Sequence, residues 1–98
     1  MNANSLAGYS IHFSKQAEKQ LSKLPTLIQH AIIKTLYQLV EDHSSSLDIK
    51  KLSGYSKLYR IRVGEYRVVY EPLHKKVVVY VLYMGHRKSI YDELKRLM

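Results

Sequence analysis

Residues 59–71 read YRIRVGEYRVVYE, and the fold of the chain can be worked out from this stretch. Side chains alternate with a period of two on both sides of Gly64-Glu65, which is typical of a β-hairpin with a two-residue turn. A type II′ turn, with Gly64 at a positive φ angle, would fix the register of the two strands. That register brings three apolar or aromatic pairs onto one face: Val63 with Tyr66, Ile61 with Val68, and Tyr59 with Tyr70. This face of the hairpin is therefore predicted to contact the hydrophobic core.

The opposite face of the hairpin receives three arginines, Arg60, Arg62 and Arg67, together with Val69. Arg62 would lie directly across from Arg67, and like charges whose Cβ atoms are about 5 Å apart destabilise a strand pair by roughly a few tenths of a kcal/mol. Glu71 is the only acidic residue that the hairpin places on this face. A solvated face can carry arginines, because their aliphatic stems cover apolar surface. A bound phosphate would relieve the repulsion, since guanidinium groups donate paired hydrogen bonds to phosphate oxygens.

The segment before the hairpin predicts one strand followed by two helices. In Tyr9–Phe13 every second residue is apolar or aromatic, which indicates a strand. Ser14 can cap a helix over residues 15–24, and Pro25 ends that helix while it serves as the first turn of another. Apolar residues recur at helical spacing over residues 27–40, so a second helix is predicted there.

After the hairpin, residues 77–84 read VVVYVLYM, and this continuous apolar run predicts a central strand that is covered on both faces. Residues 72–76 predict the turn that leads into it. Residues 85–88 are expected to leave the strand, and Ser89 can cap a short closing helix. Residues 50–54, before the hairpin, are predicted only to lead toward the sheet.

The predicted order of elements is strand, helix, helix, three strands and helix. This order indicates a single α+β domain over residues 1–98, in which two antiparallel helices pack on one face of a four-stranded, mostly antiparallel sheet. The short polar N-terminus, residues 1–8, is expected to be flexible.

The chain carries 16 Lys and Arg against 8 Asp and Glu, a formal net charge of +8. Such a balance favours a polyanionic partner, which includes nucleic acid, an anionic membrane surface and an acidic protein. The absence of cysteine excludes disulfides and thiolate zinc sites. No apolar run approaches the roughly 20 residues of a membrane-spanning helix, and the start of the chain lacks the pattern of a signal peptide. A cytoplasmic protein without a membrane partner is therefore expected.

Several familiar site motifs are absent from the sequence. The five histidines lack metal-ligand spacing, and neither a P-loop nor a GxGxxG motif occurs. Neither a metal ion nor a nucleotide cofactor is therefore expected.

Residues 85–91, GHRKSIY, add candidates for a site near the arginines. His86 and Arg87 are expected at the sheet edge, and Tyr91 is expected on the first turn of the closing helix. His86 and Tyr91 would approach the arginines if the final strand pairs next to the hairpin. The alternative is that His86 is an ordinary surface histidine and that Tyr91 packs in the core beside Ile90.

Four segments together resemble the RelE/ParE toxin superfamily, and more closely its RelE branch of ribosome-dependent mRNA interferases. They are YSIHF, the helical hairpin ending near LVED, KKLSGYSKLYRIRVGEYRVVYE and VLYMGHRKSIY, and the resemblance covers Tyr9 to Leu94. The family's cleavage site carries basic residues on the hairpin and the last strand, followed by a tyrosine. The matching positions here are Arg60, Arg62, Arg67, Arg87 and Tyr91.

The reaction that this resemblance implies is attack of a ribose 2′-hydroxyl on the adjacent phosphate, without a metal ion. Negative charge accumulates on the phosphorus oxygens in the transition state, and fixed guanidinium groups stabilise such charge. We expect Arg67 and Arg87 to do so, and Arg60 to hold a neighbouring phosphate or share the charge. Tyr91 is expected to stack on a base or to orient the 2′-hydroxyl.

The sequence departs from the best-known RelE pattern at the general base. Lysines stand in that pattern where Arg60 and Arg62 stand here, and a guanidinium group stays protonated, so it is a poor base. His86 is one candidate, because imidazole titrates near neutral pH. Glu71 is another, and a third alternative is that electrostatics and substrate alignment act without a base.

The resemblance also implies partners. In this family the ribosome presents mRNA in its decoding site, so Lys50, Lys51 and Lys57 are expected to contact ribosomal RNA phosphates, unless they are simply solvated lysines. A cognate antitoxin with a disordered, often acidic segment would fold as it binds, giving a hetero-oligomeric complex. Two alternatives remain open: a ParE-like, non-enzymatic poison of DNA gyrase, and an inactive relic that binds only antitoxin or nucleic acid.

Overall fold

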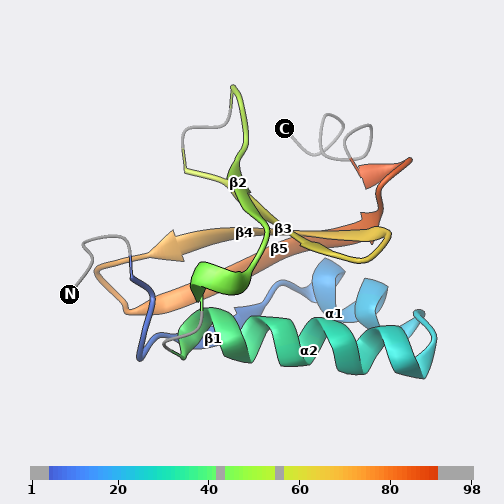
Figure 1. Cartoon of the computed structure of the whole chain (residues 1–98), viewed down its shortest axis with the longest axis horizontal. Helices are drawn as coiled ribbons and strands as arrows, with labels where there is room; N and C mark the ends of the chain where they lie inside the picture. The colour runs from blue at the N-terminus through green and yellow to red at the C-terminus, as the bar shows by residue number, and fades with distance from the viewer. Residues whose placement is uncertain (1–4, 42–43, 55–56, 91–98) are drawn as a thin grey trace.

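The structure, a computed structural model, describes residues 5–41, 44–54 and 57–90 of the chain. Its elements are, in chain order, β1 (Ser10–Phe13), α1 (Lys15–Ser22), α2 (Thr26–Val40), the 3-10 helix η1 (Ser44–Ser46), β2 (Ile49–Lys51), β3 (Tyr59–Val63), β4 (Tyr66–Leu73) and β5 (Val78–His86). Figure 1 shows α1 and α2 on the same side of the sheet. The predicted closing helix and Tyr91 fall on residues 91–98, outside the described residues. No helix in the described ranges is long and apolar enough to cross a membrane.

The two predicted N-terminal helices are confirmed; α1 begins at its expected cap, Ser14, whereas Pro25, predicted in the first turn of α2, lies just before that helix. The Ser14 hydroxyl accepts a hydrogen bond from the Ala17 N–H at 3.0 Å, which satisfies one of the free donors at the start of α1. The same hydroxyl donates to the Leu82 carbonyl at 2.7 Å. Pro25 immediately precedes α2 with a φ of −55°, an angle that leads into a helix. The cap of α1 thus also fastens this helix to β5.

The N-terminal segment that we expected to be flexible is partly packed. Leu6 is buried in the main hydrophobic core, and the Gly8 N–H donates to the Val40 carbonyl at the end of α2 at 2.9 Å. Residues 1–4 lie outside the described residues. Burial of one leucine side chain contributes about 1.5–3 kcal/mol, so residues 6–8 are held against α2.

The strands form one sheet in the order β1-β5-β4-β3-β2, in which β1 runs parallel to β5 and every other neighbouring pair is antiparallel. The expected count of four strands is wrong, because Ile49–Lys51 forms an additional edge strand, β2, that pairs with β3. Three residues are too few to display an alternating pattern, so the sequence gives no sign of this strand.

The β3–β4 hairpin has the predicted register. Its pairs are Tyr59 with Tyr70, Arg60 with Val69, Ile61 with Val68, Arg62 with Arg67, and Val63 with Tyr66. Gly64 has a φ of 59°, in the left-handed region that glycine adopts at little steric cost. The predicted role of Gly64 in the turn is therefore confirmed.

The main hydrophobic core lies between the helices and one face of the sheet. Ile32, Leu36 and Leu39 of α2 are buried against Ile61 of β3 and Val68 of β4. The three α2 residues recur at helical spacing and so form one apolar face of the helix. Side chains alternate along each strand, so Ile61 and Val68 lie on the sheet face that meets this helix.

Tyr70 is the largest side chain that is almost fully buried in this core. Its ring stacks on that of Tyr59, with centroids 5.8 Å apart. Burial raises the pKa of the Tyr70 hydroxyl above that of an ordinary tyrosine, and the nearby Tyr59 adds to this effect.

β5 contains a β-bulge at Leu82. Tyr70 pairs with Val81 and Val69 pairs with Tyr83, so Leu82 has no partner on β4. The extra residue reverses the alternation of side chains along β5. Val81 therefore faces the helices, whereas Tyr83, two residues later, faces the opposite side.

A second, smaller hydrophobic cluster lies on the sheet face away from the helices, and it consists of Leu52, Leu58, Val69, Tyr83 and Ile90. The prediction that β5 is covered on both faces is thus confirmed. The prediction that the chain leaves β5 at Gly85 is wrong, because Gly85 pairs with Arg67 and His86 pairs with Tyr66. The longer strand brings residues 85–86 beside the hairpin.

Candidate active site

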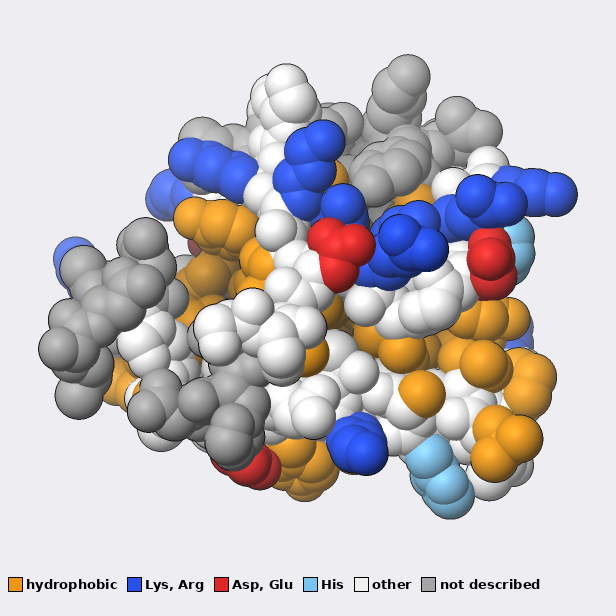
Figure 2. Space-filling view, in the orientation of Figure 1, with side chains coloured by type: hydrophobic (Ala, Val, Ile, Leu, Met, Phe, Trp, Pro, Cys, Tyr) orange, Lys and Arg blue, Asp and Glu red, His pale blue; other side chains and the backbone are white. Residues whose placement is uncertain are grey.

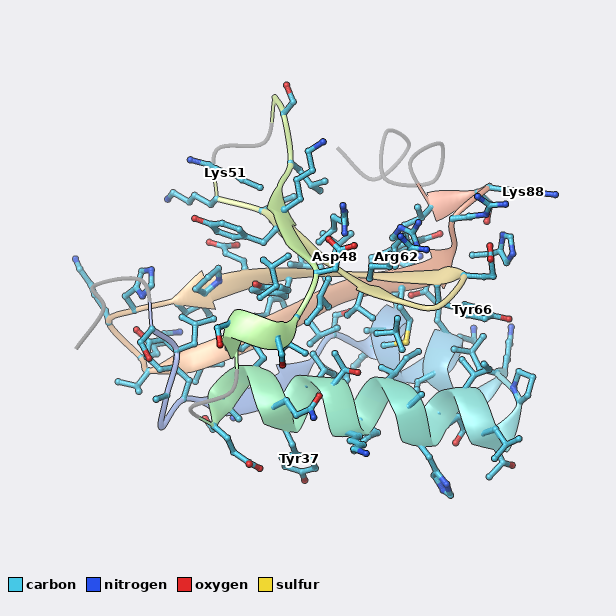
Figure 3. The ribbon with its side chains drawn as sticks, in the orientation of Figure 1. Tyr37, Asp48, Lys51, Arg62, Tyr66 and Lys88 are labelled. Carbon is cyan, nitrogen blue, oxygen red and sulfur yellow. The ribbon has the colours of Figure 1, made fainter. Side chains whose placement is uncertain are left out.

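Three arginines lie on the sheet face opposite α1 and α2, which we call the arginine face. Arg62 pairs with Arg67, and Arg60 lies two residues from Arg62 on β3. In Figure 3, Arg62 points to the side of the sheet away from the helices. Figure 2 shows Lys and Arg side chains gathered along this side, with a few acidic groups among them. The sequence prediction of a basic face is therefore confirmed.

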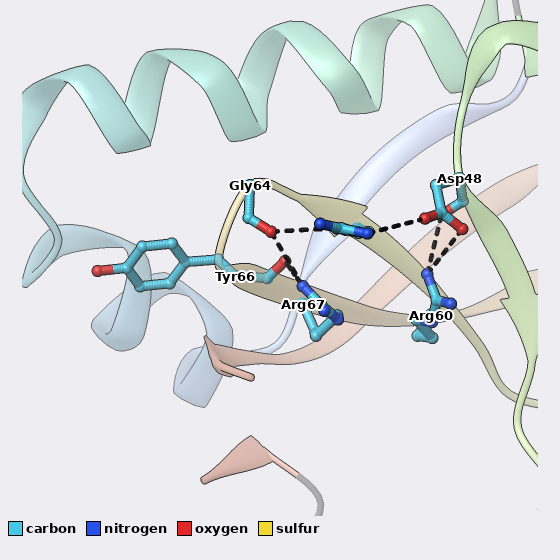
Figure 4. A network of polar contacts seen from close by, with 6 residues as sticks. Asp48, Arg60, Gly64, Tyr66 and Arg67 are labelled. Carbon is cyan, nitrogen blue, oxygen red and sulfur yellow. Dashed lines mark hydrogen bonds and ion pairs between the residues drawn. The ribbon is translucent and has the colours of Figure 1, made fainter. Parts of the chain in front are cut away.

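Asp48, which immediately precedes β2, binds two of these arginines (Figure 4). Arg60 Nη1 donates to the Asp48 carbonyl at 3.2 Å and to Asp48 Oδ1 at 3.0 Å. Arg62 Nη1 lies 3.8 Å from Asp48 Oδ2. The Arg62 backbone N–H donates to the Asp48 carbonyl at 2.9 Å. One aspartate thus supplies counter-charge to two adjacent arginines.

The two ion pairs of Asp48 differ in exposure. The Arg60 side chain is 15% exposed, whereas that of Arg62 is 54% exposed. Exposed ion pairs contribute only about 0.2–1 kcal/mol, because water screens them. Arg60 is therefore held firmly, and the end of the Arg62 side chain stays accessible to a ligand.

Carbonyl groups of the hairpin turn hold Arg67. Arg67 Nη1 donates to the carbonyls of Gly64 and Tyr66, both at 3.1 Å, and Arg62 Nε donates to the Gly64 carbonyl at 3.4 Å. Nε and Nη2 of Arg67 have no hydrogen-bond partner among the described residues. Both guanidinium groups are thus positioned by the turn, with donors left for an anion.

Arg87 is fastened to the same turn. Its backbone N–H donates to the Glu65 carbonyl at 2.8 Å, and its guanidinium group forms an ion pair with the Glu65 carboxylate. Both side chains are more than half exposed. The structure therefore brings Arg87 to the end of the hairpin that carries Arg62 and Arg67.

His86 lies on the other face of the sheet. It pairs with Tyr66, and the two rings meet edge to face with centroids 5.6 Å apart. Figure 3 places Tyr66 on the helix side of the hairpin, away from Arg62. His86 Nδ1 also accepts the Lys88 backbone N–H at 3.2 Å. The geometry thus does not bring His86 together with the arginines, and its role as a base stays a prediction.

The three lysines predicted to bind RNA lie in different places. Lys50 pairs with Arg60 and so shares the arginine face, whereas Lys51 pairs with Tyr59 on the other face. Lys57 lines a groove of about 560 Å³ at the far end of the hairpin, together with Tyr59, Glu71, Pro72, Leu73, His74, Lys75 and Lys76. Only Lys50 lies beside the arginines.

The second candidate base, Glu71, is on the arginine face but distant from Arg67. It lies four residues beyond Arg67 on β4, a separation of about 13 Å at about 3.3 Å per residue. In the described ranges no group of three His, Asp or Glu side chains could hold a metal ion. What the described side chains offer at this site is fixed positive charge with free N–H donors, which suits a phosphate group.

Comparison with known proteins adds to this geometry. A family model described as the ParE toxin of type II toxin-antitoxin system, parDE, matches residues 11–91. The mRNA interferase toxin RelE of Escherichia coli (strain K12) is 32% identical over 95 residues, which cover 92% of this chain and 98% of that protein. The chain belongs to the RelE/ParE toxin superfamily. Toxin RelE3 of Methanocaldococcus jannaschii is also similar to this RelE/ParE toxin, at 37% identity over 83 residues that cover 82% of this chain and 92% of that protein.

Solved structures agree with this assignment to the RelE/ParE superfamily. A RelB-RelE antitoxin-toxin complex from Methanococcus jannaschii contains a chain with a TM-score of 0.69 and 35% identity, covering 83% of this chain and 95% of that one. The intact E. coli RelBE toxin-antitoxin complex contains a chain with a TM-score of 0.66 and 30% identity, covering 80% and 95%. The α+β fold of this toxin is thus RelE-like, with five strands.

One residue of the site in this RelE/ParE toxin was missed by sequence reasoning, namely Asp48. Ile49 pairs with Ile61 in antiparallel β2 and β3, so the residue before Ile49 comes to lie beside Arg62. An opposite charge at this position relieves the repulsion between Arg62 and Arg67. Recognising β2 as a strand would have been the signal that identified Asp48.

Proposed function

We propose that this protein is the toxin of a type II toxin-antitoxin system and that it cleaves mRNA in the ribosomal decoding site without a metal ion. The observation that carries the proposal is the cross-strand pair of the exposed Arg62 and the half-buried Arg67, with Arg87 tied to the same hairpin turn. Two of the relatives are named mRNA interferases, which supports a ribonuclease activity.

The proposed reaction is an in-line transfer at phosphorus. The ribose 2′-oxygen attacks the adjacent phosphate, the bond from phosphorus to the 5′-oxygen breaks, and the products carry a 2′,3′-cyclic phosphate and a 5′-hydroxyl. The 2′-hydroxyl loses a proton, and the leaving 5′-oxygen gains one. Arg62, Arg67 and Arg87 stabilise the negative charge that grows on the phosphate oxygens, because their donors are already oriented by the protein.

In the proposed reaction, general base catalysis contributes little to the rate. His86 faces the helix side of the sheet, and Glu71 is four residues along β4 from Arg67. Charge stabilisation and alignment of the 2′-hydroxyl therefore provide most of the acceleration. Tyr91, which lies outside the described residues, keeps its expected role of stacking on a base or orienting the 2′-hydroxyl.

The ribosome and an antitoxin are the proposed partners. Lys50, Lys51 and Lys57 are exposed and would contact ribosomal RNA phosphates in a sequence-independent, salt-sensitive way. Relatives occur in RelB-RelE complexes, so we expect a cognate antitoxin for this chain. An acidic segment of that antitoxin, folding as it binds, would cover the basic surface in a hetero-oligomeric complex.

Primer extension tests the proposal directly. A defined mRNA is held on ribosomes and treated with the purified protein, while a parallel reaction contains naked RNA. We expect cuts confined to the codon in the decoding site. Cuts on naked RNA would show instead that the protein is a ribonuclease that acts without the ribosome. The absence of cuts in both reactions would contradict an enzymatic toxin.

A second candidate follows from the description of the family model, which names ParE. A ParE-like protein would bind DNA gyrase and trap it on DNA without cleaving a phosphate bond. The cross-strand pairing of Arg62 and Arg67 favours the ribonuclease, because a gyrase poison needs no phosphate-binding pair. Gyrase-linked DNA breaks in cells that express the protein would favour the second candidate instead.

A further inference from the structure

The arginine face contains an anion of its own, the carboxylate of Asp48. This carboxylate is 51% exposed and lies within 4 Å of both Arg60 and Arg62. Among the described residues no other carboxylate pairs with these two arginines. Asp48 therefore already supplies an anion to two of the three arginines on this face.

We propose that Asp48 divides the arginine face into an anchor and a ligand-binding pair. Arg60 is the anchor, which stays bound to Asp48, whereas Arg62 and Arg67 bind an RNA phosphate. When that phosphate binds, it replaces Asp48 as the anion that pairs with Arg62. This inference rests on the proposed function, and it gives Arg60 a different role from the one that the family resemblance implies.

The contacts of Arg60 support its role as an anchor. Its Nη1 donates to both the carbonyl and the carboxylate of Asp48, and its side chain is only 15% exposed. A phosphate that displaced Asp48 from Arg60 would have to replace both bonds, and it would leave a carbonyl and a carboxylate without that donor. Arg60 thus joins β3 to the segment before β2 and fixes the position of Asp48.

The contacts of Arg62 support its exchange between two anions. Its Nη1 lies 3.8 Å from Asp48 Oδ2, which is too long for a hydrogen bond. Its Nε makes only a 3.4 Å bond to the Gly64 carbonyl, and the end of the side chain is in water. A phosphate can therefore replace the Asp48 carboxylate beside Arg62 with a closer, paired contact.

The free donors of Arg67 complete the phosphate site. Arg67 lies directly across from Arg62, and within the described ranges its guanidinium group is bonded through Nη1 alone. Its cross-strand neighbour on β5 is Gly85, which has no side chain to cover the guanidinium group. Two arginines therefore lie side by side on neighbouring strands, with Asp48 as the competing anion.

The test measures binding of a short fluorescent single-stranded DNA oligonucleotide to the purified chain over a range of salt concentrations. This probe has phosphates but no 2′-hydroxyl, so it binds without being cleaved. For Asp48→Asn we expect about two- to fivefold tighter binding at low salt, because the competing charge is gone while the amide oxygen still accepts a bond from Arg60. The salt dependence should also become steeper, because no cation has to neutralise Asp48 when Arg62 leaves it.

Glu18→Gln is the charge-matched control. It removes one negative charge from the exposed surface of α1, away from the arginine face, and should alter binding much less than Asp48→Asn. If the two variants bind the probe equally well, the gain comes from net charge alone and the proposal is overturned. Asp48→Glu retains the charge and should bind like the unaltered protein. This control shows that a change at position 48 does not alter binding merely by disturbing the fold.

A second comparison separates the anchor from the binding pair. Arg62→Gln should reduce the slope of log affinity against log salt by about 0.7, the value for one lost phosphate contact on a single strand. Arg60→Gln should leave that slope unchanged and lower the melting temperature instead. Equal loss of slope in both variants would refute the division of roles. The double variant Asp48→Asn, Arg62→Gln should lose the gain seen in Asp48→Asn.

This assay is independent of the ribosome and of the 2′-hydroxyl. If Asp48→Asn binds more tightly while the unaltered protein cuts no RNA, the anion exchange holds and the proposed enzymatic function fails. If the protein cuts mRNA on ribosomes but Asp48→Asn behaves like Glu18→Gln, the function holds and the inference fails. If the oligonucleotide binds no variant even at low salt, the phosphate-binding pair itself is refuted.

Discussion

His86 and Tyr66 face each other across β4 and β5, with ring centroids 5.6 Å apart, while Arg67, the next residue after Tyr66, lies on the opposite face. The sheet therefore separates the imidazole from the arginines. A base has to reach the proton that it removes, within a hydrogen bond or through one water. The position of His86 favours a reaction driven by charge stabilisation.

We therefore expect His86→Ala to cleave mRNA at a rate within about threefold of the unaltered protein, because loss of a true general base costs about 10²–10⁴ in rate. The measurement is single-turnover cleavage on ribosomes at several values between about pH 6 and pH 8, around the range in which imidazole titrates. A hundredfold loss without a change in melting temperature would restore His86 as the base.

Arg67→Ala and Arg87→Ala should each lower the cleavage rate by about 10²–10³, the usual loss when one oriented donor to a developing negative charge is removed. Both should remain folded: the Arg87 side chain forms an exposed ion pair with Glu65, which contributes less than about 1 kcal/mol, and that of Arg67 bonds to carbonyls of the turn. Single-turnover rates and thermal unfolding are measured side by side. Lys88→Ala, which removes an exposed charge next to Arg87, is the matched control, and equal losses in Lys88→Ala and Arg87→Ala would contradict a specific role for Arg87.

Gly64→Ala should destabilise the protein by about 1 kcal/mol, because alanine is strained at the φ of 59° that Gly64 adopts. Gly64→Asn should lose less, since asparagine tolerates the left-handed region better. Urea unfolding with an unchanged slope gives the free energy of both variants. The cleavage rate should fall in the same order, because the Gly64 carbonyl positions Arg62 and Arg67. Equal stability of the two variants would show that the turn carries no strain.

Tyr70→Phe should make the protein less sensitive to alkali. Burial raises the pKa of Tyr70 in the folded state, so its contribution to stability is complete below the unfolded pKa of about 10 and is lost as the pH rises beyond it. Between about pH 9 and pH 11 the free energy of unfolding should therefore fall less steeply in Tyr70→Phe than in the unaltered protein, by up to about 1.4 kcal/mol per pH unit. Tyr37→Phe, at a side chain that is 57% exposed, is the control and should leave the slope unchanged.

Local patterns in the sequence were sufficient for the helices, the hairpin and the arginine face. Ser14 marks one helix start through its side-chain hydroxyl and Pro25 marks the other through its fixed φ, while Gly64 marks the turn from which the register of the hairpin follows. Because side chains alternate strictly along paired strands, the opposition of Arg62 and Arg67 followed from that register alone.

The features that the sequence did not predict depend on contacts between distant segments. The continuous apolar run of β5 conceals the bulge at Leu82, because a strand that is apolar on both faces has no alternation to interrupt. The bulge decides that His86 faces the helices. β2 is too short for its pattern to be visible, and with it the position of Asp48 beside Arg62 was missed.

The parallel pairing of β1 with β5 has a consequence for the biosynthesis of the protein. Ser14, directly after β1, is bonded to Leu82 of β5, and the two residues are 68 positions apart in the chain. Contacts of such long range form late and slow the folding of a domain, because the intervening chain must first be ordered. A nascent chain that still lacks β5 cannot join β1 to the hairpin, because β5 lies between β1 and β4 in the sheet. The protein therefore acquires its complete basic surface only after β5 has been translated.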